Sequence, residues 1–279
     1  MKNPIYPCLW FNGNAKEGAK FYCSVFYNSS IVDENPFVSM VESSGQKFMC
    51  FNGGPEFAFN PSVSFFVVCE TEEETDKTWN KLLERGTALM PLGKYDWSSK
   101  YGWVEDRFGV SWQISYSKME DVGQKFTPSL MFTGKQHGKA EEAIQYYTSL
   151  FKNSGIVGIL KYTKEENDVA GTVKHAQFTL NKNVFMAMDS ALMPQFSFNE
   201  AISFVVECES QEEIDYFWSK FTAEGEEGQC GWLKDKFSVP WQIIPAILRD
   251  LMNDTSKSER VINAFMQMKK FDIQKLREA

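Results

Sequence analysis

The sequence predicts an α+β fold in which one structural unit occurs twice, followed by a short helical tail. The main observation is an internal repeat. Residues 57–86 and 196–225 align without a gap, and roughly half of their positions are identical. A second pair, GWVEDRFGVSWQI from Gly102 and GWLKDKFSVPWQI from Gly231, follows in the same order. A long repeat of this kind indicates two copies of one supersecondary arrangement.

The length of the chain agrees with the repeat. A chain of 279 residues fits two domains of ordinary size. We therefore expect a first unit at residues 1–120, a second unit at 121–245 and a helical tail at 246–279. A hydrophobic content of 43%, with 24 phenylalanines, is sufficient for two cores.

In unit one, apolar runs and turn signals predict the order β-α-β-β, with a weak fourth strand, and then β-α-β-β-β. Asn12-Gly13-Asn14 marks the first turn, and Thr71 with Glu74 forms a capping box before the second helix. The expected elements are a strand at 7–11, a helix at 15–26, a hairpin of 37–42 with 47–51, a central strand at 62–69, a helix ending at Gly86, and strands near 88–91, 102–105 and 111–115.

Unit two repeats this order, and Ser210 with Glu213 repeats the capping box. The expected elements are a strand at 128–132, a helix at 140–151, a hairpin of 173–180 with 184–189, a central strand at 201–208, and closing strands at Trp232 and 241–243. In the tail, short helices are expected at 247–252 and 260–269, whereas residues 117–127 form a polar linker after unit one.

Composition argues against several classes of protein. A net charge of −8 and a pI near 5.0 disfavour binding to nucleic acid or to anionic membranes. No apolar run approaches the roughly 18 residues of a membrane span. The N-terminal stretch does not resemble a secretory signal, and the six cysteines form no CxxC motif. We expect buried free thiols in a cytoplasmic protein.

Several segments together resemble a known family. In unit one they are LWFNGNAKEGAKFYCSVF from Leu9, SFFVVCE from Ser64 and DRFGVSWQI from Asp106; in unit two, AEEAIQYYTSLF from Ala140 and GQCGWLKDKFSVPWQIIP from Gly228. They resemble the vicinal oxygen chelate superfamily of glyoxalases, dioxygenases and bleomycin-resistance proteins, and most closely its PhnB-like branch, labelled demethylubiquinone methyltransferase-like. The resemblance implies a tandem repeat of glyoxalase-like units, each of paired βαβββ modules. Because many members pair as dimers, it also implies a monomer with an internal pseudo-dimer, although a homodimer stays possible.

The resemblance also allows a test for metal binding. Metal-using members take ligands from three strand positions, which fall here on Pro7, Ser62 and Gln113 in unit one and on Pro128, Ala201 and Gln242 in unit two. Proline and alanine have no donor atom, and a neutral glutamine amide is a poor ligand. We therefore expect no metal. A bound methyl donor is not expected either, because no glycine-rich turn joins a strand to a helix. No other cofactor is indicated.

The remaining candidate residues are polar or aromatic positions on the strands that would line each cavity. The expected ligand-binding set is Phe11, Ser64, Trp103 and Gln113 in unit one, with Phe132, Asp189, Ser203, Trp232 and Gln242 in unit two. His175 is the candidate catalytic base, with Asp189 as its carboxylate. Core packing is the alternative for the tryptophans, and a hydrogen-bonded strand position is the alternative for His175.

Three functions remain open on this sequence. The first is a metal-free protein that binds a small aromatic or amphipathic molecule. The alternative is an enzyme of the lyase, isomerase or hydrolase type, or the family's nominal methyltransferase, with His175 as base in unit two. The third is a scaffold in which a degenerate unit one supports unit two.

Overall fold

The computed structural model describes residues 4–192 and 196–279. These residues form two compact bodies: a main body of residues 7–202, and a C-terminal body of residues 4–6 and 203–279. The unit boundaries expected at 120 and 245 follow the sequence repeat rather than this division, and they stay a prediction. No helix in the described ranges has the length and apolar character needed to cross a membrane.

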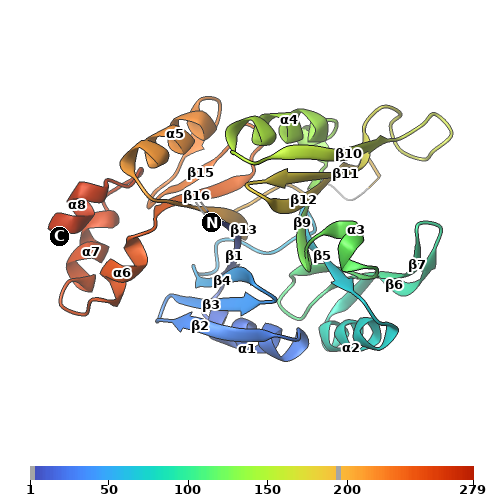
Figure 1. Ribbon diagram of the computed structural model, residues 1–279, viewed down its shortest axis with the longest axis horizontal. Coiled ribbons are helices and arrows are strands. Elements are labelled where there is room, and N and C mark those ends of the chain that lie inside the picture. Colours follow the sequence, from blue (N-terminus) through green and yellow to red (C-terminus); the bar gives the residue numbers. More distant parts are fainter. Residues whose placement is uncertain (1–3, 193–195) are drawn as a thin grey trace. The chain divides into compact units, whose positions relative to one another are not determined.

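The elements of unit one follow the predicted order (Figure 1). The first module consists of β1 (Ile5–Phe11), α1 (Ala15–Val25), β2 (Ser29–Glu34), β3 (Val38–Ser43) and β4 (Gln46–Asn52). The second consists of β5 (Val63–Cys69), α2 (Glu72–Leu83), β6 (Thr87–Tyr95), β7 (Ser98–Glu105) and β8 (Ser111–Tyr116). Strand β2 is the weak fourth strand, whose position the sequence pattern did not give.

Unit two repeats the order, and the tail follows it. The elements are α3 (Met119–Val122), β9 (Phe126–Phe132), η1 (Gly134–Gln136), α4 (Ala140–Leu150), β10 (Gly155–Lys161), β11 (Val173–Leu180), β12 (Asn183–Asp189), β13 (Ile202–Cys208), α5 (Gln211–Thr222), β14 (Glu226–Glu227), β15 (Trp232–Lys234), β16 (Pro240–Pro245), α6 (Leu248–Asn253), α7 (Ser258–Phe265) and α8 (Ile273–Glu278). The helix expected at 260–269 is wrong at its C-terminal end, because helix α7 stops at Phe265.

The sheet of the main body joins the two sequence units. Its strand order is β10-β11-β12-β9-β5-β8-β7-β6, so the second module of unit one pairs with the first module of unit two. The junction is the antiparallel pair of β5 and β9, in which Ser64 lies opposite Ser129. Strands β1, β4, β3 and β2 form a separate group in the main body, and β13, β16, β15 and β14 form the group in the C-terminal body.

Both predicted capping boxes are present, and they begin the corresponding helices of the two units. The Thr71 hydroxyl accepts a hydrogen bond from the Glu74 amide at 3.1 Å, and Ser210 accepts one from the Glu213 amide at 3.4 Å. Each box occupies amide groups that the first helical turn leaves without partners. Helix α2 then buries Trp79 and Leu82.

The repeated motif DxFxxxWQI is explained by its aspartate. The Asp106 carboxylate accepts hydrogen bonds from the amides of Phe108 (2.8 Å) and Val110 (3.1 Å) and from the indole of Trp112 (2.9 Å). In unit two, Asp235 accepts the same three bonds, from the amides of residues 237 and 239 and the indole of Trp241. The aspartate therefore closes the turn and fixes the tryptophan at the start of the final strand, β8 in unit one and β16 in unit two.

The two units differ most in the hairpin before this turn. In unit one, β6 and β7 form a long hairpin that extends at the right of Figure 1. The segment from Gly225 to Gly231 in unit two is ten residues shorter than that from Gly86 to Gly102. There the tail supplies backbone partners instead: the amide of Cys230 donates to the carbonyl of Met268, and that of Gly231 to the carbonyl of Lys269, each at 2.7 Å.

We predict that removing either aspartate destabilises the protein. Asp106→Ala and Asp235→Ala each leave one indole and two backbone amides without their acceptor, so the free energy of unfolding should fall by about 3 kcal/mol. Urea denaturation followed by tryptophan fluorescence measures this. Asp250→Ala, at an exposed aspartate of helix α6, is the control and should leave the midpoint unchanged. An unchanged midpoint for both buried variants would contradict the assignment.

Candidate functional site

One face of the main-body sheet gathers most of the polar candidates. Pairing across the strands places Ser64 beside Ser111 and Ser129, and Gln113 beside Trp103. Because directly paired residues share a face of the sheet, these side chains lie on one side. We call it the Gln113 face and define it by Ser64 and Phe66 of β5, Tyr101 and Trp103 of β7, Ser111 and Gln113 of β8, Thr127, Ser129 and Met131 of β9, and Met188 of β12.

The polar centre of this face is a buried hydrogen-bond chain. Tyr101 donates its hydroxyl to Gln113 Oε1 at 2.8 Å, and Gln113 Nε2 donates to Ser64 Oγ at 2.7 Å. Beside it, the Trp103 indole donates to Ser111 Oγ at 2.6 Å. All five side chains are buried. These two hydrogen bonds fix the orientation of Gln113, and they leave the Ser64 hydroxyl proton available to a further acceptor.

Two hydroxyl groups on strand β9 complete the centre. Thr127 and Ser129 are 0% and 1% exposed, and neither side-chain oxygen has a hydrogen-bond partner among the described residues. Burying a hydroxyl that has no hydrogen-bond partner costs about 1–3 kcal/mol. A native fold therefore rarely leaves two such hydroxyls side by side. These hydroxyls are therefore candidates for contact with a bound polar atom.

An apolar border surrounds the polar centre. Tyr101, Trp103 and Met131 form one buried cluster, against which Phe66 and Met188 pack. Tryptophan and methionine offer a large contact area, and the methionine side chains adapt to irregular shapes. The face thus combines a few neutral hydrogen-bonding groups with an aromatic and thioether border.

The ligand triplet expected for unit one, Pro7 with Ser62 and Gln113, is wrong. Strand β1, which carries Pro7, belongs to a different strand group, and the strand beside β5 is β9 of unit two. In the second triplet, Pro128 lies opposite Phe65 and so faces away from Gln113. The residues that do meet are Ser64, Gln113 and Ser129.

This set does not fit a transition-metal ion. It offers hydroxyls and an amide whose oxygen already accepts from Tyr101, whereas structural and catalytic metals take imidazole, thiolate or carboxylate ligands. Within the described residues, no group of three or more histidine, cysteine, aspartate or glutamate side chains could hold a metal ion.

Two expected aromatic positions lie in the core instead of the site. Phe11 packs against helix α1, where a Cβ on Gly18 would stand 2.6 Å from its ring, and its ring centroid is 5.5 Å from that of Phe108. The ring of Phe132 packs edge-to-face against that of Phe198, with 5.1 Å between the ring centroids. Both are fully buried on the helix-covered side of their strands, so the expectation that they line a cavity is wrong.

The structure separates His175 from Asp189. Asp189 accepts hydrogen bonds from the amides of Gly138 (2.7 Å), Ala140 (3.3 Å) and Val173 (2.9 Å), which caps the start of helix α4. Burial raises the pKa of this carboxyl, and the backbone bonds oppose the shift. Asp189 therefore holds a helix rather than a catalytic base.

His175 points to the other side of the sheet. It alternates with Ala176, which lies opposite Ala187 and so shares the side of Asp189. His175 and Gln177 lie on the side of Met186 and Ser129, toward the outer edge of the Gln113 face. The side chain remains exposed, yet desolvation by the surrounding protein lowers the pKa of its imidazole.

The C-terminal body contains a reduced copy of the polar centre. Gln242 Nε2 donates to Ser203 Oγ at 2.9 Å, and Trp232 lies opposite Gln242, as Trp103 lies opposite Gln113. The position of Tyr101 is taken by Cys230, so the aromatic donor to the glutamine is missing.

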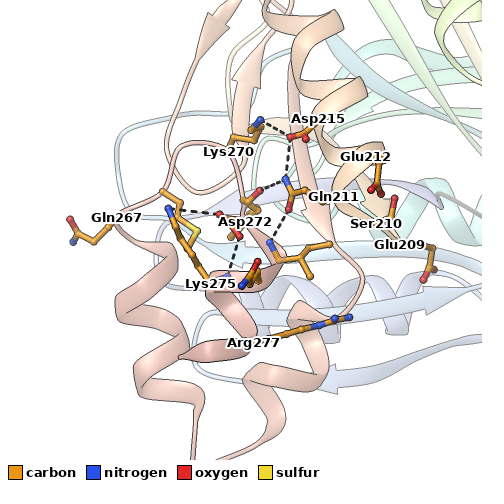
Figure 2. A pocket seen from close by; sticks show the side chains of 14 residues that line it. Glu209, Ser210, Gln211, Glu212, Asp215, Gln267, Lys270, Asp272, Lys275 and Arg277 are labelled. Atoms are coloured by element: carbon orange, nitrogen blue, oxygen red, sulfur yellow. Dashed lines mark hydrogen bonds and ion pairs between the residues drawn. The ribbon is translucent and has the colours of Figure 1, made fainter.

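A separate hollow of about 940 Å³ lies between the start of α5 and the tail (Figure 2). Its polar side chains are bonded to one another and to the backbone of the tail. Gln211 donates to the carbonyl of Phe271 at 3.0 Å and accepts from the amide of Ile273 at 2.9 Å, while Lys270 pairs with Asp215 at 2.5 Å. The hollow contains none of the predicted site residues, and its contacts fasten the tail to the helix.

Comparison with solved structures defines the class of fold. Glyoxalase I from Zea mays superposes with a TM-score of 0.61 over 91% of this chain and 97% of its own, at 8% identity. At this identity the match concerns the fold alone: two glyoxalase-like units in tandem. The α+β tandem architecture predicted from the sequence is confirmed.

The family follows from the sequence. The model described as 3-demethylubiquinone-9 3-methyltransferase matches residues 3–115 and 124–244, so the chain belongs to this PhnB-like family and carries its unit twice. A PhnB protein from Bacillus cereus, described as a putative 3-demethylubiquinone-9 3-methyltransferase, is 40% identical over 39% of this chain and 96% of its own (TM-score 0.37). A Pseudomonas aeruginosa protein is 22% identical over 39% and 92% (TM-score 0.34). No curated protein matches.

We predict that Gln113 stabilises the fold through both of its bonds. Gln113→Ala leaves Tyr101 and Ser64 without their shared partner and should lower the free energy of unfolding by about 2 kcal/mol. Tyr101→Phe removes one of these bonds and should cost about half as much. Urea denaturation gives both values. If Gln113→Ala were as stable as the wild type, the hydrogen bonds of Gln113 to Tyr101 and Ser64 would not contribute to the stability of the fold.

Proposed function

We propose that the protein binds a small, neutral, amphipathic molecule on the Gln113 face without a metal ion. The observation that carries this proposal is the buried centre in which Gln113 is held by Tyr101 and Ser64, while the Ser129 and Thr127 hydroxyls have no partner within the part of the chain that the structure describes. Such a site consists of a few oriented polar groups within an apolar border, which is the usual composition of small-molecule sites.

The chemistry of the centre favours a neutral polar group on the ligand. Hydroxyls can donate or accept, and the centre contains no ionised side chain to compensate a buried charge. Glu105, two residues beyond Trp103 on the same face, is the neighbouring carboxylate, and burial raises the pKa of that group. A carbonyl, hydroxyl or amide would therefore bind with the least desolvation cost.

The proposal includes a cytoplasmic location and a monomeric chain. None of the six cysteines, which all lie in the described ranges, forms a disulfide, and a reducing compartment maintains such thiols. Methyl transfer is not part of the proposal, because the sequence has no glycine-rich turn of the kind that holds an adenosyl donor.

The first test separates binding from stability. Thr127→Val with Ser129→Ala removes the two hydroxyls and leaves the surrounding bonds intact, so the variant should be as stable as the wild type or more stable. Native mass spectrometry of the untagged protein from its own host should show a small-molecule adduct on the wild type and at least tenfold less on the variant.

The matched control is Ser203→Ala. Its hydroxyl accepts from Gln242, so this variant should lose about 1 kcal/mol of stability and keep the adduct. A wild-type protein without adduct, or equal adduct on the double variant, would contradict the proposal.

A second candidate function is an enzyme with His175 as base. Its support is the position of His175 toward the edge of the Gln113 face and the lowered pKa of its imidazole. A neutral imidazole at neutral pH can accept a proton, and in this version His175→Ala abolishes turnover but retains ligand.

We predict that the imidazole of His175 titrates at a lower pH in the folded protein than in the unfolded chain. Because folding lowers its pKa below the ordinary value of about 6.5, the unfolded chain binds the proton more readily, and His175 contributes stability that is lost as the pH falls through this window. An NMR titration of the imidazole signals measures the midpoint, and His137→Ala assigns them, since the chain has two histidines. A midpoint at or above about 6.5 would show that the folded protein does not desolvate the His175 imidazole.

A further inference from the structure

We propose that the β6–β7 hairpin forms the outer half of the binding site and that the ligand contains a planar aromatic ring. This inference rests on the function proposed above, and it specifies the ligand class and an additional specificity-determining residue, Trp97. None of the residues in the hairpin turn was among the candidates from the sequence.

Three aromatic rings of the hairpin lie in contact. The Tyr95 and Trp97 rings are stacked, with centroids 5.0 Å apart and planes at 25°. Tyr101 meets both edge-on, at 5.8 Å from Tyr95 and 6.0 Å from Trp97. These geometries are the favourable ones for aromatic pairs, so the rings form an ordered group at the end of the hairpin.

This group runs from the surface to the polar centre. Trp97 is 66% exposed, whereas Tyr101 is 7% exposed. Tyr101 is also the residue that donates to Gln113, and it belongs to the apolar cluster with Trp103 and Met131. A ring placed against Trp97 would therefore continue a row of aromatic side chains that ends at the hydroxyls of the centre.

The second sequence unit lacks all three aromatic residues of this group. Its hairpin is ten residues shorter, and the counterparts of Tyr95 and Trp97 fall within the missing segment. Cys230 replaces Tyr101, and its amide is bonded to Met268 of the tail. Unit one has thus kept a long hairpin with an exposed tryptophan where unit two has a short connection.

The ligand chemistry follows from the two ends of the row. The outer end offers flat π surfaces, which favour a flat ring over a saturated one of equal size. The inner end offers neutral hydroxyls, which favour a single uncharged oxygen substituent. A hydroxylated fused aromatic ring satisfies both, and we use 2-naphthol as the probe.

Isothermal titration calorimetry tests the inference with the full-length protein. The wild type should bind 2-naphthol at least tenfold more tightly than decahydro-2-naphthol, its saturated analogue, and more tightly than 2-naphthoate, which carries a charge. Trp97→Ala should weaken 2-naphthol binding about tenfold, and Trp97→Phe should restore most of the affinity. Neither variant removes a buried contact of the core, because the side chain is mostly exposed.

The matched control is Phe37→Ala, at an aromatic residue 52% exposed outside the site, and it should leave the affinity unchanged. Equal affinity of Trp97→Ala and wild type, equal binding of the saturated analogue, or no binding of 2-naphthol would each overturn the inference. The adduct measured on the Thr127 and Ser129 double variant judges the proposed function separately, so the two can fail independently.

Discussion

The antiparallel pairing of β5 with β9 is the contact on which the rest of the main body depends. It joins the central strand of unit one to the first strand of unit two and places Ser64 opposite Ser129. Because a sheet has a side-chain period of two, this register places Ser129 and Met131 on the face that Ser64 shares with Gln113 and Trp103. A shift of β9 by one residue would turn Ser129 and Met131 toward the helices.

The two units share the same local hydrogen-bonding motifs, whereas their candidate sites differ. The aspartate turn, the capping boxes and the pair of glutamine with serine occur twice with nearly equal distances. These features stabilise strands and turns, so both copies need them. The hairpin and the residue at position 101 differ, since Tyr101 corresponds to Cys230. Divergence is thus concentrated where a ligand would make contact.

The sequence predicted most of the elements and part of the candidate site. Periodicity and the repeat gave most strands and helices, and alternation correctly put Ser64 with Gln113. It could not give strand neighbours, which depend on the packing of the whole sheet, so Pro7 was wrongly grouped with Gln113 and the contribution of Ser129 was missed. Alternation also states which residues share a side but not which side is covered by helices, and for that reason Phe11 was assigned to the cavity. Tyr101 had a signal, since it alternates with Trp103, but no motif drew attention to it.

The composition of the C-terminal body has a consequence for synthesis. This body contains residues 4–6, and the amide of Glu207 donates to the carbonyl of Pro4, so one of its backbone partners is made before the main-body sheet and the rest after it. The tail residues that bond to Cys230 and Gly231 are later still. The main-body sheet, in contrast, lies between Val63 and Asp189 and can assemble while translation continues. Residues 4–6 must therefore wait for residues 203–279, and the slow step of folding should be the closure of this long loop.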